Sequence, residues 1–305
     1  MSIVVIGSFM MDLVVRTKRA PGAGETIIGN SFGRFPGGKG ANQAAAAARL
    51  GGRVAMIGKL GKDPFGDDFR DVLRQEGIDD THVRTDERHA TGIGSIVVEE
   101  SGENRIIVVP GANLHYTVEE LAEVEAVVQN AQVVVMQLEM DIATIESAAQ
   151  MAKRHGVPLI LNPAPAQPLS DELLAATTIL TPNETELELL TGVKVATIED
   201  AENAAKQLLA KGVGQVVVTL AAKGALIVGA DGSRHVPGFR VTPVDTVAAG
   251  DSFNGALAVQ LTEGKSLAEA ARFANAVGAL TVTRQGAIPS LPHRNEVESF
   301  MKGEQ

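Results

Sequence analysis

The sequence predicts an α/β protein built around a doubly wound, mostly parallel sheet. Short runs of β-branched residues alternate with Ala- and Leu-rich amphipathic stretches that are long enough for helices. Strands separated by helices of about ten residues or more are typical of βαβ units and of parallel sheets. The strand runs are apolar throughout, which indicates a sheet covered by helices on both faces.

The expected elements follow this alternation along the whole chain. Strands are expected at the Val-, Ile- and Leu-rich runs Ile3–Ile6, Val54–Ile57, Val133–Gln137, Leu159–Leu161 and Val216–Leu220. Helices are expected at the amphipathic stretches Asn42–Leu50, Asp67–Gln75, Ile142–His155, Glu184–Leu190, Ile198–Lys211, Gly255–Glu263 and Leu267–Thr283. We find neither a repeat nor an interdomain linker, so residues 1–305 are expected to form a single domain.

Two segments, at about residues 13–34 and 91–110, break the alternation because they have few helix signals. In the second segment, Ser95–Val98 and Arg105–Val109 flank Ser-Gly-Glu-Asn at 101–104, which predicts a β-hairpin. We therefore expect these segments to form a small β-sheet lid over the edge of the main sheet. The alternative is that they are plain β-excursions on the surface.

The composition excludes several classes of protein. Its ordinary proportions exclude a disordered or collagen-like chain. No apolar run reaches the roughly 18–20 residues that span a bilayer, and Asp12 interrupts the apolar start, so neither a membrane partner nor a signal peptide is expected. The absence of Cys fits a reducing compartment, and we expect a cytoplasmic protein. A net charge of −10 argues against nucleic-acid binding.

The string Asp245–Ala256, DTVAAGDSFNGA, carries the strongest chemical signal. Ala248, Ala249 and Gly250 precede an expected helix, where small residues let phosphate oxygens approach the exposed N–H groups as an anion hole. Asp251 would lie beside the transferring phosphate, where its carboxylate can accept the proton of an attacking hydroxyl. The alternative for Asp251 is a simple helix N-cap.

The Gly-rich string Pro36–Gln43, PGGKGANQ, leads into the first expected helix. It matches neither GxxxxGK[ST] nor GxGxxG, so it is not one of the usual nucleotide loops. Its glycines allow a close approach to the backbone, and Lys39 and Asn42 could bind a polyhydroxyl ligand. The alternative is an ordinary Gly-rich helix entry.

Thr181–Glu186, TPNETE, contains Asn183 and Glu186 at the spacing of a capping box. The functional alternative places both residues near a hydrated Mg²⁺ on nucleotide phosphates, since Mg²⁺ keeps several waters and needs few protein ligands.

Two further strings are weaker signals. Glu139, in MQLE, follows a strand at the edge where α/β proteins bind ligands, and it either touches a sugar hydroxyl or is simply solvated. Thr219–Gly224 is a strand followed by a turn that could hold a nucleotide. The six histidines show no zinc-type spacing.

The motifs, in the order in which they occur along the sequence, resemble those of the ribokinase-like (PfkB) family of sugar kinases. The resemblance extends over nearly the whole chain. The strings GS at 7–8, NPAPA at 162–166 and VPGFRV at 236–241 add to the resemblance. The resemblance implies a three-layer ribokinase-like fold, phosphorylation of a sugar hydroxymethyl group by ATP, and ATP, Mg²⁺ and K⁺ as cofactors. It also implies a homodimer that forms through the lid.

The resemblance assigns roles residue by residue. Asp251 is implied as the catalytic base. The sugar would contact Met10, Asp12, Gly38, Lys39, Asn42, Glu139 and Asp251. The nucleotide would contact Asn183, Thr219, Leu220, Ala221, Ala222, Lys223, Gly224, Gly250 and Asn275. A monovalent cation would lie beside Asp245, Val247, Thr281, Arg284, Gly286 and Ser290.

Met10 departs from the pattern of the family. Ribokinases commonly have Asn two residues before the first sugar-binding Asp, whereas deoxyribokinases have Met there. Methionine offers no comparable hydrogen bond to a hydroxyl group. The expected function is ATP-dependent phosphorylation of D-ribose at the 5-hydroxyl, with 2-deoxyribose as the alternative substrate. A nucleoside or hexose kinase of the same family and a catalytically silent sugar-binding regulator are the alternatives.

Overall fold

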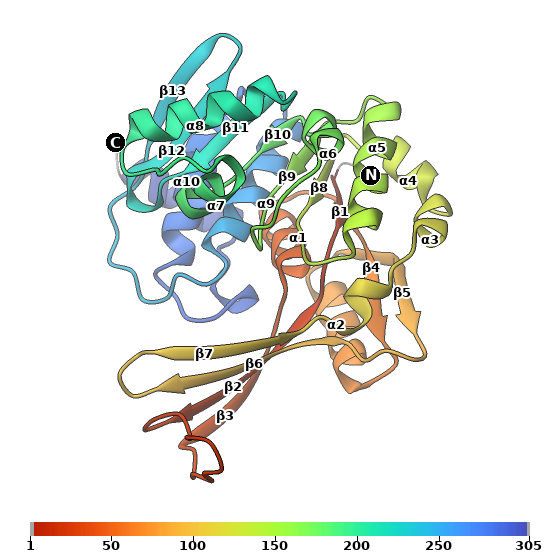
Figure 1. Cartoon of the computed structure of the whole chain (residues 1–305), viewed down its shortest axis with the longest axis vertical. Coiled ribbons are helices and arrows are strands. Elements are labelled where there is room, and N and C mark those ends of the chain that lie inside the picture. Colours follow the sequence, from red (N-terminus) through yellow and green to blue (C-terminus); the bar gives the residue numbers. More distant parts are fainter. Residues whose placement is uncertain (1–2, 304–305) are drawn as a thin grey trace.

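The computed structural model describes residues 3–303 and has two sheets of very different size (Figure 1). The larger sheet has nine strands in the order β13-β12-β11-β10-β9-β8-β1-β4-β5. Their bounds are β1 Ile3–Ile6, β4 Val54–Gly61, β5 Asp79–Asp86, β8 Val133–Met136, β9 Leu159–Leu161, β10 Ile179–Leu180, β11 Gln215–Thr219, β12 Gly224–Gly229 and β13 Gly232–Pro237. The strands from β11 to β5 are parallel, and β12 and β13 extend the sheet antiparallel.

Helices cover both faces of this sheet. One face packs against α1 (Lys39–Arg49), α2 (Pro64–Gln75), α9 (Ala249–Thr262), α10 (Leu267–Thr281) and α11 (Arg294–Gly303). The other packs against α3 (Val118–Ala122), α4 (Glu125–Gln129), α5 (Ile142–Arg154), α6 (Asp171–Ala176), α7 (Glu184–Thr191) and α8 (Ile198–Ala210). In β1, Ile3 and Val5 belong to the first core, and Val4 and Ile6 belong to the second. The three-layer, mostly parallel architecture expected from the sequence is confirmed.

Several element bounds differ from those expected. The start of α9 was placed wrongly at Gly255, because its first six residues, AGDSFN, include several that disfavour helix interiors. The helix begins at Ala249, and its first two turns pack against α1. The start of α2 at Pro64 was also missed, although Asp63 caps the helix and Pro is favoured in its first turn.

The smaller sheet projects from the carboxyl ends of the main strands, at the bottom of Figure 1. Its strand order is β3-β2-β6-β7, with β2 Met10–Thr17, β3 Ser31–Gly37, β6 Gly92–Glu99 and β7 Asn104–Val109. The antiparallel β6–β7 pair is the hairpin that the sequence predicted. The strands β2 and β3 reach beyond the expected segment 13–34 on both sides, so the smaller sheet includes Met10 and Asp12.

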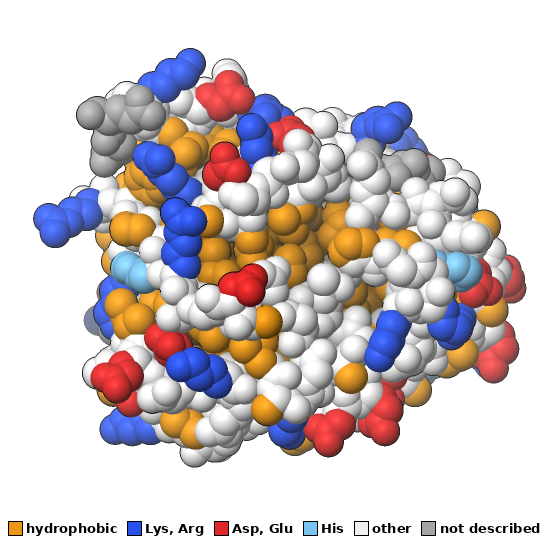
Figure 2. Space-filling model, turned by 90° about the horizontal axis from the view of Figure 1, so that it is seen from above, with side chains coloured by type: hydrophobic (Ala, Val, Ile, Leu, Met, Phe, Trp, Pro, Cys, Tyr) orange, Lys and Arg blue, Asp and Glu red, His pale blue; other side chains and the backbone are white. Residues whose placement is uncertain are grey.

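The opposite end of the molecule, on the side of the strands' amino ends, is seen in Figure 2. Basic and acidic side chains are interspersed there around a central band of hydrophobic side chains. Among the helices of residues 3–303, none combines the length and the hydropathy of a membrane span. The predicted site residues gather at the other end, where the strands of the main sheet meet the smaller sheet.

Candidate active site

The first turn of α9 is partly open to the solvent, since Gly250 is exposed and Ala248 and Ala249 are partly exposed. Ala248 precedes the helix in the left-handed conformation, with φ of 60°. The first N–H groups of a helix have no intrahelical acceptor, and they carry a positive partial charge. A Cβ placed on Gly250 would meet no heavy atom within 4 Å. The residues 248–250 therefore form a surface on which an anion can approach the backbone closely.

Asp251 is the third residue of α9 and not its N-cap, so the capping alternative is wrong. Its carboxylate is 7% exposed, and each oxygen accepts one amide hydrogen bond. Asn42 Nδ2 donates to Oδ2 over 2.9 Å, and Gln43 Nε2 donates to Oδ1 over 3.1 Å. Both donors lie on α1, so the packing of α1 against α9 holds the carboxylate in one orientation.

Glu139 lies just after β8 and reaches the start of α1. Its Oε2 accepts from the Ser8 hydroxyl over 2.5 Å and from the Lys39 N–H over 3.0 Å. The turn after β1, the end of β8 and the Gly-rich string therefore meet at this carboxylate. Gly38, with φ of 88°, forms the N-cap position of α1 and allows this turn.

Asp12 faces the same region from the second strand of the chain. Burial raises the pKa of its carboxyl to about 6, and the nearby negative charge of Glu139 adds to the shift. Two carboxylates that lie near each other form a ready acceptor pair for hydroxyl groups. Met10 lies two residues earlier in β2 and is 5% exposed, paired with Gly37 and Gly92 on the neighbouring strands.

A cleft of about 190 Å³ lies beside the start of α9, and Met10, Asp12 and Glu139 are not among the residues that line it. Asp251, Lys39 and the residues 248–250 line one part, and Asn183, Glu186 and Thr219 line another. Burial lowers the pKa of Lys39, but the charges of Asp251, Glu139 and Glu186 more than offset this, so the net shift is upward. Lys39 therefore stays cationic, as a group that stabilises phosphate charge must.

Asn183 and Glu186 form the expected capping box of α7. The Asn183 side chain accepts from Glu186 N over 2.8 Å, and Glu186 Oε2 accepts from Asn183 N over 2.9 Å. Burial raises the pKa of Glu186, although Asn183 N and Lys39 oppose the shift. The capping role and a place in the cleft are thus compatible.

The segment 219–224 begins next to Asn183, since Thr219 N donates to Pro182 O over 2.9 Å. Ala221, Ala222 and Lys223 are exposed, whereas the Leu220 side chain is buried in the core. Asn275 is buried, and its Nδ2 donates to the carbonyls of Val236 and Pro237. Its amide therefore ties α10 to the end of β13, and Gly224 begins the neighbouring strand β12.

The residues expected around a monovalent cation are brought together. Asp245 accepts from Val247 N through Oδ1 and from Gly286 N through Oδ2, both over 3.0 Å. The backbone N–H of Asp245 also binds the carbonyl of Val282, directly after Thr281. The Arg284 guanidinium turns away to Glu296, so only its backbone can face the loop. Ser290 Oγ binds the carbonyl of Ala287 within the same loop.

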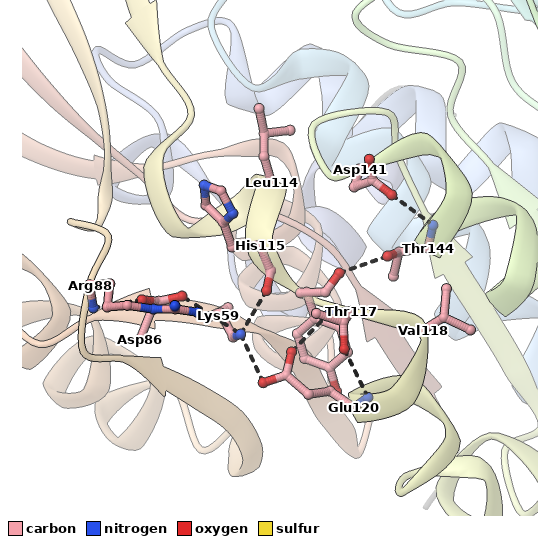
Figure 3. A pocket seen from close by; sticks show the side chains of 11 residues that line it. Lys59, Asp86, Arg88, Leu114, His115, Thr117, Val118, Glu120, Asp141 and Thr144 are labelled. Carbon is pink, nitrogen blue, oxygen red and sulfur yellow. Dashed lines mark hydrogen bonds and ion pairs between the residues drawn. The ribbon is translucent and has the colours of Figure 1, made fainter.

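A larger cavity of about 450 Å³ lies near the end of β4 and outside this cluster (Figure 3). Its buried Lys59 pairs with Glu120 over 2.8 Å and donates to the His115 carbonyl over 2.7 Å. Asp86 accepts from the backbone N–H groups of Arg88 and His89. These charges are satisfied by one another, which leaves the cleft beside Asp251 as the candidate active site.

Four buried amides in this region were not predicted as site residues. They are Gln43, Gln137, Asn162 and Asn254. Each of the four lies in one of the strings that carry the family resemblance, GANQ, MQLE, NPAPA and GDSFN. Membership of these strings was the signal that could have identified them. A single sequence does not show that such side chains meet across the fold.

A carboxylate beside the partly open first turn of a helix, facing a cleft that also holds the Lys39 ammonium, is the arrangement of a phosphotransferase that acts on a hydroxyl group. The sequence matches the pfkB family of carbohydrate kinases over residues 1–294, and the chain belongs to this family. The chain is an ATP-dependent sugar kinase.

Named relatives cover nearly the whole chain. The chain is 44% identical to the ribokinase of Haemophilus influenzae, over 99% of this chain and 98% of that protein. It is 37% identical to the deoxyribokinase of Salmonella typhi, over 99% of each. The solved structure of Arabidopsis thaliana ribokinase complexed with ribose and ATP aligns with a TM-score of 0.95 and 36% identity, over 99% of this chain and 98% of that one.

Proposed function

We propose that this protein phosphorylates D-ribose at the 5-hydroxyl with ATP, giving ribose 5-phosphate and ADP. The observation that carries the proposal is the meeting of Asp251, Lys39 and Glu139 at one edge of the sheet. The similarity to ribokinases from several organisms supports ribose as the sugar.

In the proposed mechanism, Asp251 accepts the proton of the sugar 5-hydroxyl as its oxygen attacks the γ-phosphorus of ATP. The new O–P bond forms while the bond to the β-phosphate oxygen breaks, and ADP leaves with that electron pair. The N–H groups at the start of α9 and the Lys39 ammonium stabilise the negative charge on the transferring group. Asp12, Gly38, Asn42 and Glu139 hold the sugar hydroxyls.

The nucleotide would lie along Asn183, Gly250, Asn275 and the segment Thr219–Gly224, with Mg²⁺ on its phosphates. Among residues 3–303, no group of three or more acidic or His side chains is arranged to hold a metal. Bound Mg²⁺ would therefore keep most of its waters, with Asn183 and Glu186 close to them. When bound, Mg²⁺ would neutralise phosphate charge.

The Asp245 loop fits a monovalent cation such as K⁺. The Asp245 carboxylate and the backbone carbonyls of Val247, Thr281, Arg284, Gly286 and Ser290 would supply oxygen ligands. Asp245 already joins the chain before α9 to the loop at Gly286. A cation there would add positive charge next to the anion site.

A second candidate function is phosphorylation of 2-deoxyribose, which Met10 favours because its side chain cannot pair with a 2-hydroxyl. Purified protein should release ADP from ATP only when a sugar is added. A panel of ribose, 2-deoxyribose, hexoses and nucleosides ranks the substrates. No sugar-dependent turnover across the panel would leave the non-catalytic sugar-binding regulator.

The smaller sheet would act as a lid and pair with the same sheet of a second copy of this chain. Its edge strand β7 exposes Ile106, Ile107, Val108 and Val109, and Phe32 is exposed on the other edge strand, β3. Apolar side chains gathered on a sheet with free edges mark an interaction surface. We place the dimer in the cytoplasm, where ATP is available and a chain without Cys needs no oxidising environment.

A further inference from the structure

We propose that Gln43 is a positioning residue for Asp251, and that Gln137 fixes the orientation of Gln43. The proposal rests on the proposed role of Asp251 as the base. Gln43 lies on α1 and Gln137 at the end of β8, so the pair links the main sheet to the carboxylate. Both side chains are almost fully buried, at 0% and 1% exposed.

The hydrogen bonds define a chain of amides. Gln137 Nε2 donates to Gln43 Oε1 over 2.7 Å. The amino group of Gln43 then faces the other way and donates to Asp251 Oδ1 over 3.1 Å and to Asn162 Oδ1 over 3.2 Å. A flipped Gln43 amide would point its oxygen at two acceptors and its amino group at a donor. This series of hydrogen bonds therefore allows only one orientation of the Gln43 amide.

Gln137 is itself held tightly by the turn after β1. A Cβ on Gly7 would lie 2.1 Å from Gln137 Oε1, so only glycine at position 7 leaves room for this side chain. Gln137 Oε1 is buried without a hydrogen-bond partner. A buried polar atom without a partner costs stability, and an apolar side chain would avoid that cost. This cost points to a role for the Gln137 amide beyond stability.

The consequence for Asp251 is a fixed carboxylate plane. Gln43 binds Oδ1 while Asn42 binds Oδ2, so the carboxylate cannot rotate without losing both bonds. Each oxygen keeps a lone pair for the hydroxyl proton. Gln43 thus acts on the reaction through Asp251, without touching the substrate.

The test replaces each glutamine by methionine, which has a similar length and no amide. Gln43→Met is expected to lower kcat about 10- to 100-fold, the usual cost of one hydrogen bond to a charged group. Ribose affinity, measured by calorimetry, should stay within about threefold of the wild-type value, since the substitution removes no contact with the sugar. Gln137→Met should also lower kcat, but by a smaller factor than Gln43→Met.

Gln260→Met is the matched control, because Gln260 is also a buried glutamine but binds Glu263 at the far end of α9. It should leave kcat unchanged. In an Asp251→Asn background, Gln43→Met should cause no further loss, since groups that act as one unit are not additive. If Gln43→Met does not fold, Gln137→Met and Gln137→Leu carry the same test.

Wild-type kcat in the Gln43 or Gln137 variants would overturn the positioning role. If Gln43→Met lowers kcat in the Asp251→Asn background as much as it does in the wild type, the positioning role is also wrong. A change confined to KM would likewise overturn it. The proposed function is tested separately, by sugar-dependent turnover of the wild-type protein and by the loss of that turnover in Asp251→Asn.

Discussion

Asn42 donates from Nδ2 to Oδ2 of Asp251 over 2.9 Å, although 209 residues separate them in the chain. This one bond joins the Gly-rich string at the start of α1 to the small-residue string at the start of α9. The two helices pack side by side, so the proposed sugar-binding and phosphate-binding regions share a rigid support. Asp251, the proposed base, is therefore positioned by the fold before any ligand binds.

Asp251→Asn should nearly abolish turnover while leaving ribose binding intact. The substitution keeps the size of the side chain and removes the oxygen that accepts the proton. General-base catalysis is worth about 10²- to 10⁴-fold in rate. Single-turnover kinetics and calorimetry separate the two effects. A variant with kcat within about threefold of wild type would exclude Asp251 as the base.

Asp12 should make sugar binding sensitive to mild acid. Its folded-state pKa of about 6 lies above the ordinary 3.8, so the carboxylate takes up a proton as the pH falls through 6. The protonated form is a poorer acceptor for two hydroxyls, and ribose affinity should fall below that pH. The affinity of Asp12→Asn for ribose should be low and nearly independent of pH between 5 and 8.

The same pKa predicts a change in stability. A raised carboxyl pKa means that the charged form is unfavourable in the folded protein, so the penalty is present above pH 6 and absent below pH 4. Asp12→Asn should raise the free energy of unfolding by about 1–3 kcal/mol at pH 8. The gain should vanish near pH 4. Denaturant titrations at both pH values measure it, and an equal gain at the two values would contradict the assignment.

The core and the site strings were predictable, because each depends on a local pattern. The run LIL gives β9 with its observed bounds, Leu159–Leu161, and the Asn183–Glu186 spacing gives a real capping box. The hairpin of β12 and β13 was missed, although Asp231–Gly232 between two β-rich runs is a turn signal. The strand β10 has only two residues, too few for any period to show.

The pairing of buried amides could not be predicted from one sequence. Gln43 and Gln137 are polar residues in apolar surroundings, and nothing local distinguishes a core amide from an exposed one. Their partners are 208 and 94 residues away, so the tertiary fold alone brings them together. The start of α9 escaped prediction for a related reason, since its first turns are stabilised by contact with α1.

Potassium should raise kcat, and sodium should do so less. The Asp245 loop contacts the segment that leads into α9, so a bound cation would shape the anion site at Ala248–Gly250. Assays in Tris buffer with KCl, NaCl or neither measure the effect, with choline chloride as the control for ionic strength. Equal rates in all of these buffers would remove the cation from the mechanism.

Ile107→Glu should convert the proposed dimer to a monomer. Ile107 is 69% exposed on β7, and a charge there would be buried unpaired in a sheet-to-sheet interface. Leu189→Glu is the matched control, because Leu189 is 50% exposed on α7, outside the smaller sheet. Sedimentation velocity reports the mass of each variant. A wild-type monomer, or a dimer that survives Ile107→Glu, would exclude this surface.

Met10→Asn should shift the preference toward ribose over 2-deoxyribose. Met10 is buried in β2, two residues before Asp12, at the base of the smaller sheet. If its side chain lies beside carbon 2 of the sugar, it tolerates a hydroxyl or a hydrogen there. The introduced amide would pair with the 2-hydroxyl and would be left without a partner by 2-deoxyribose.

The size of the shift follows from this asymmetry. Sites that hydrogen-bond a hydroxyl reject its absence more strongly than apolar sites reject its presence. A neutral hydrogen bond contributes about 0.5–1.5 kcal/mol, so the ratio of the two kcat/KM values should change about 2- to 12-fold. Met10→Leu is the control, since it keeps the site apolar and should leave the ratio near that of wild type. An unchanged ratio in Met10→Asn would mean that position 10 does not contact carbon 2, and Met10 would then carry no information about the substrate.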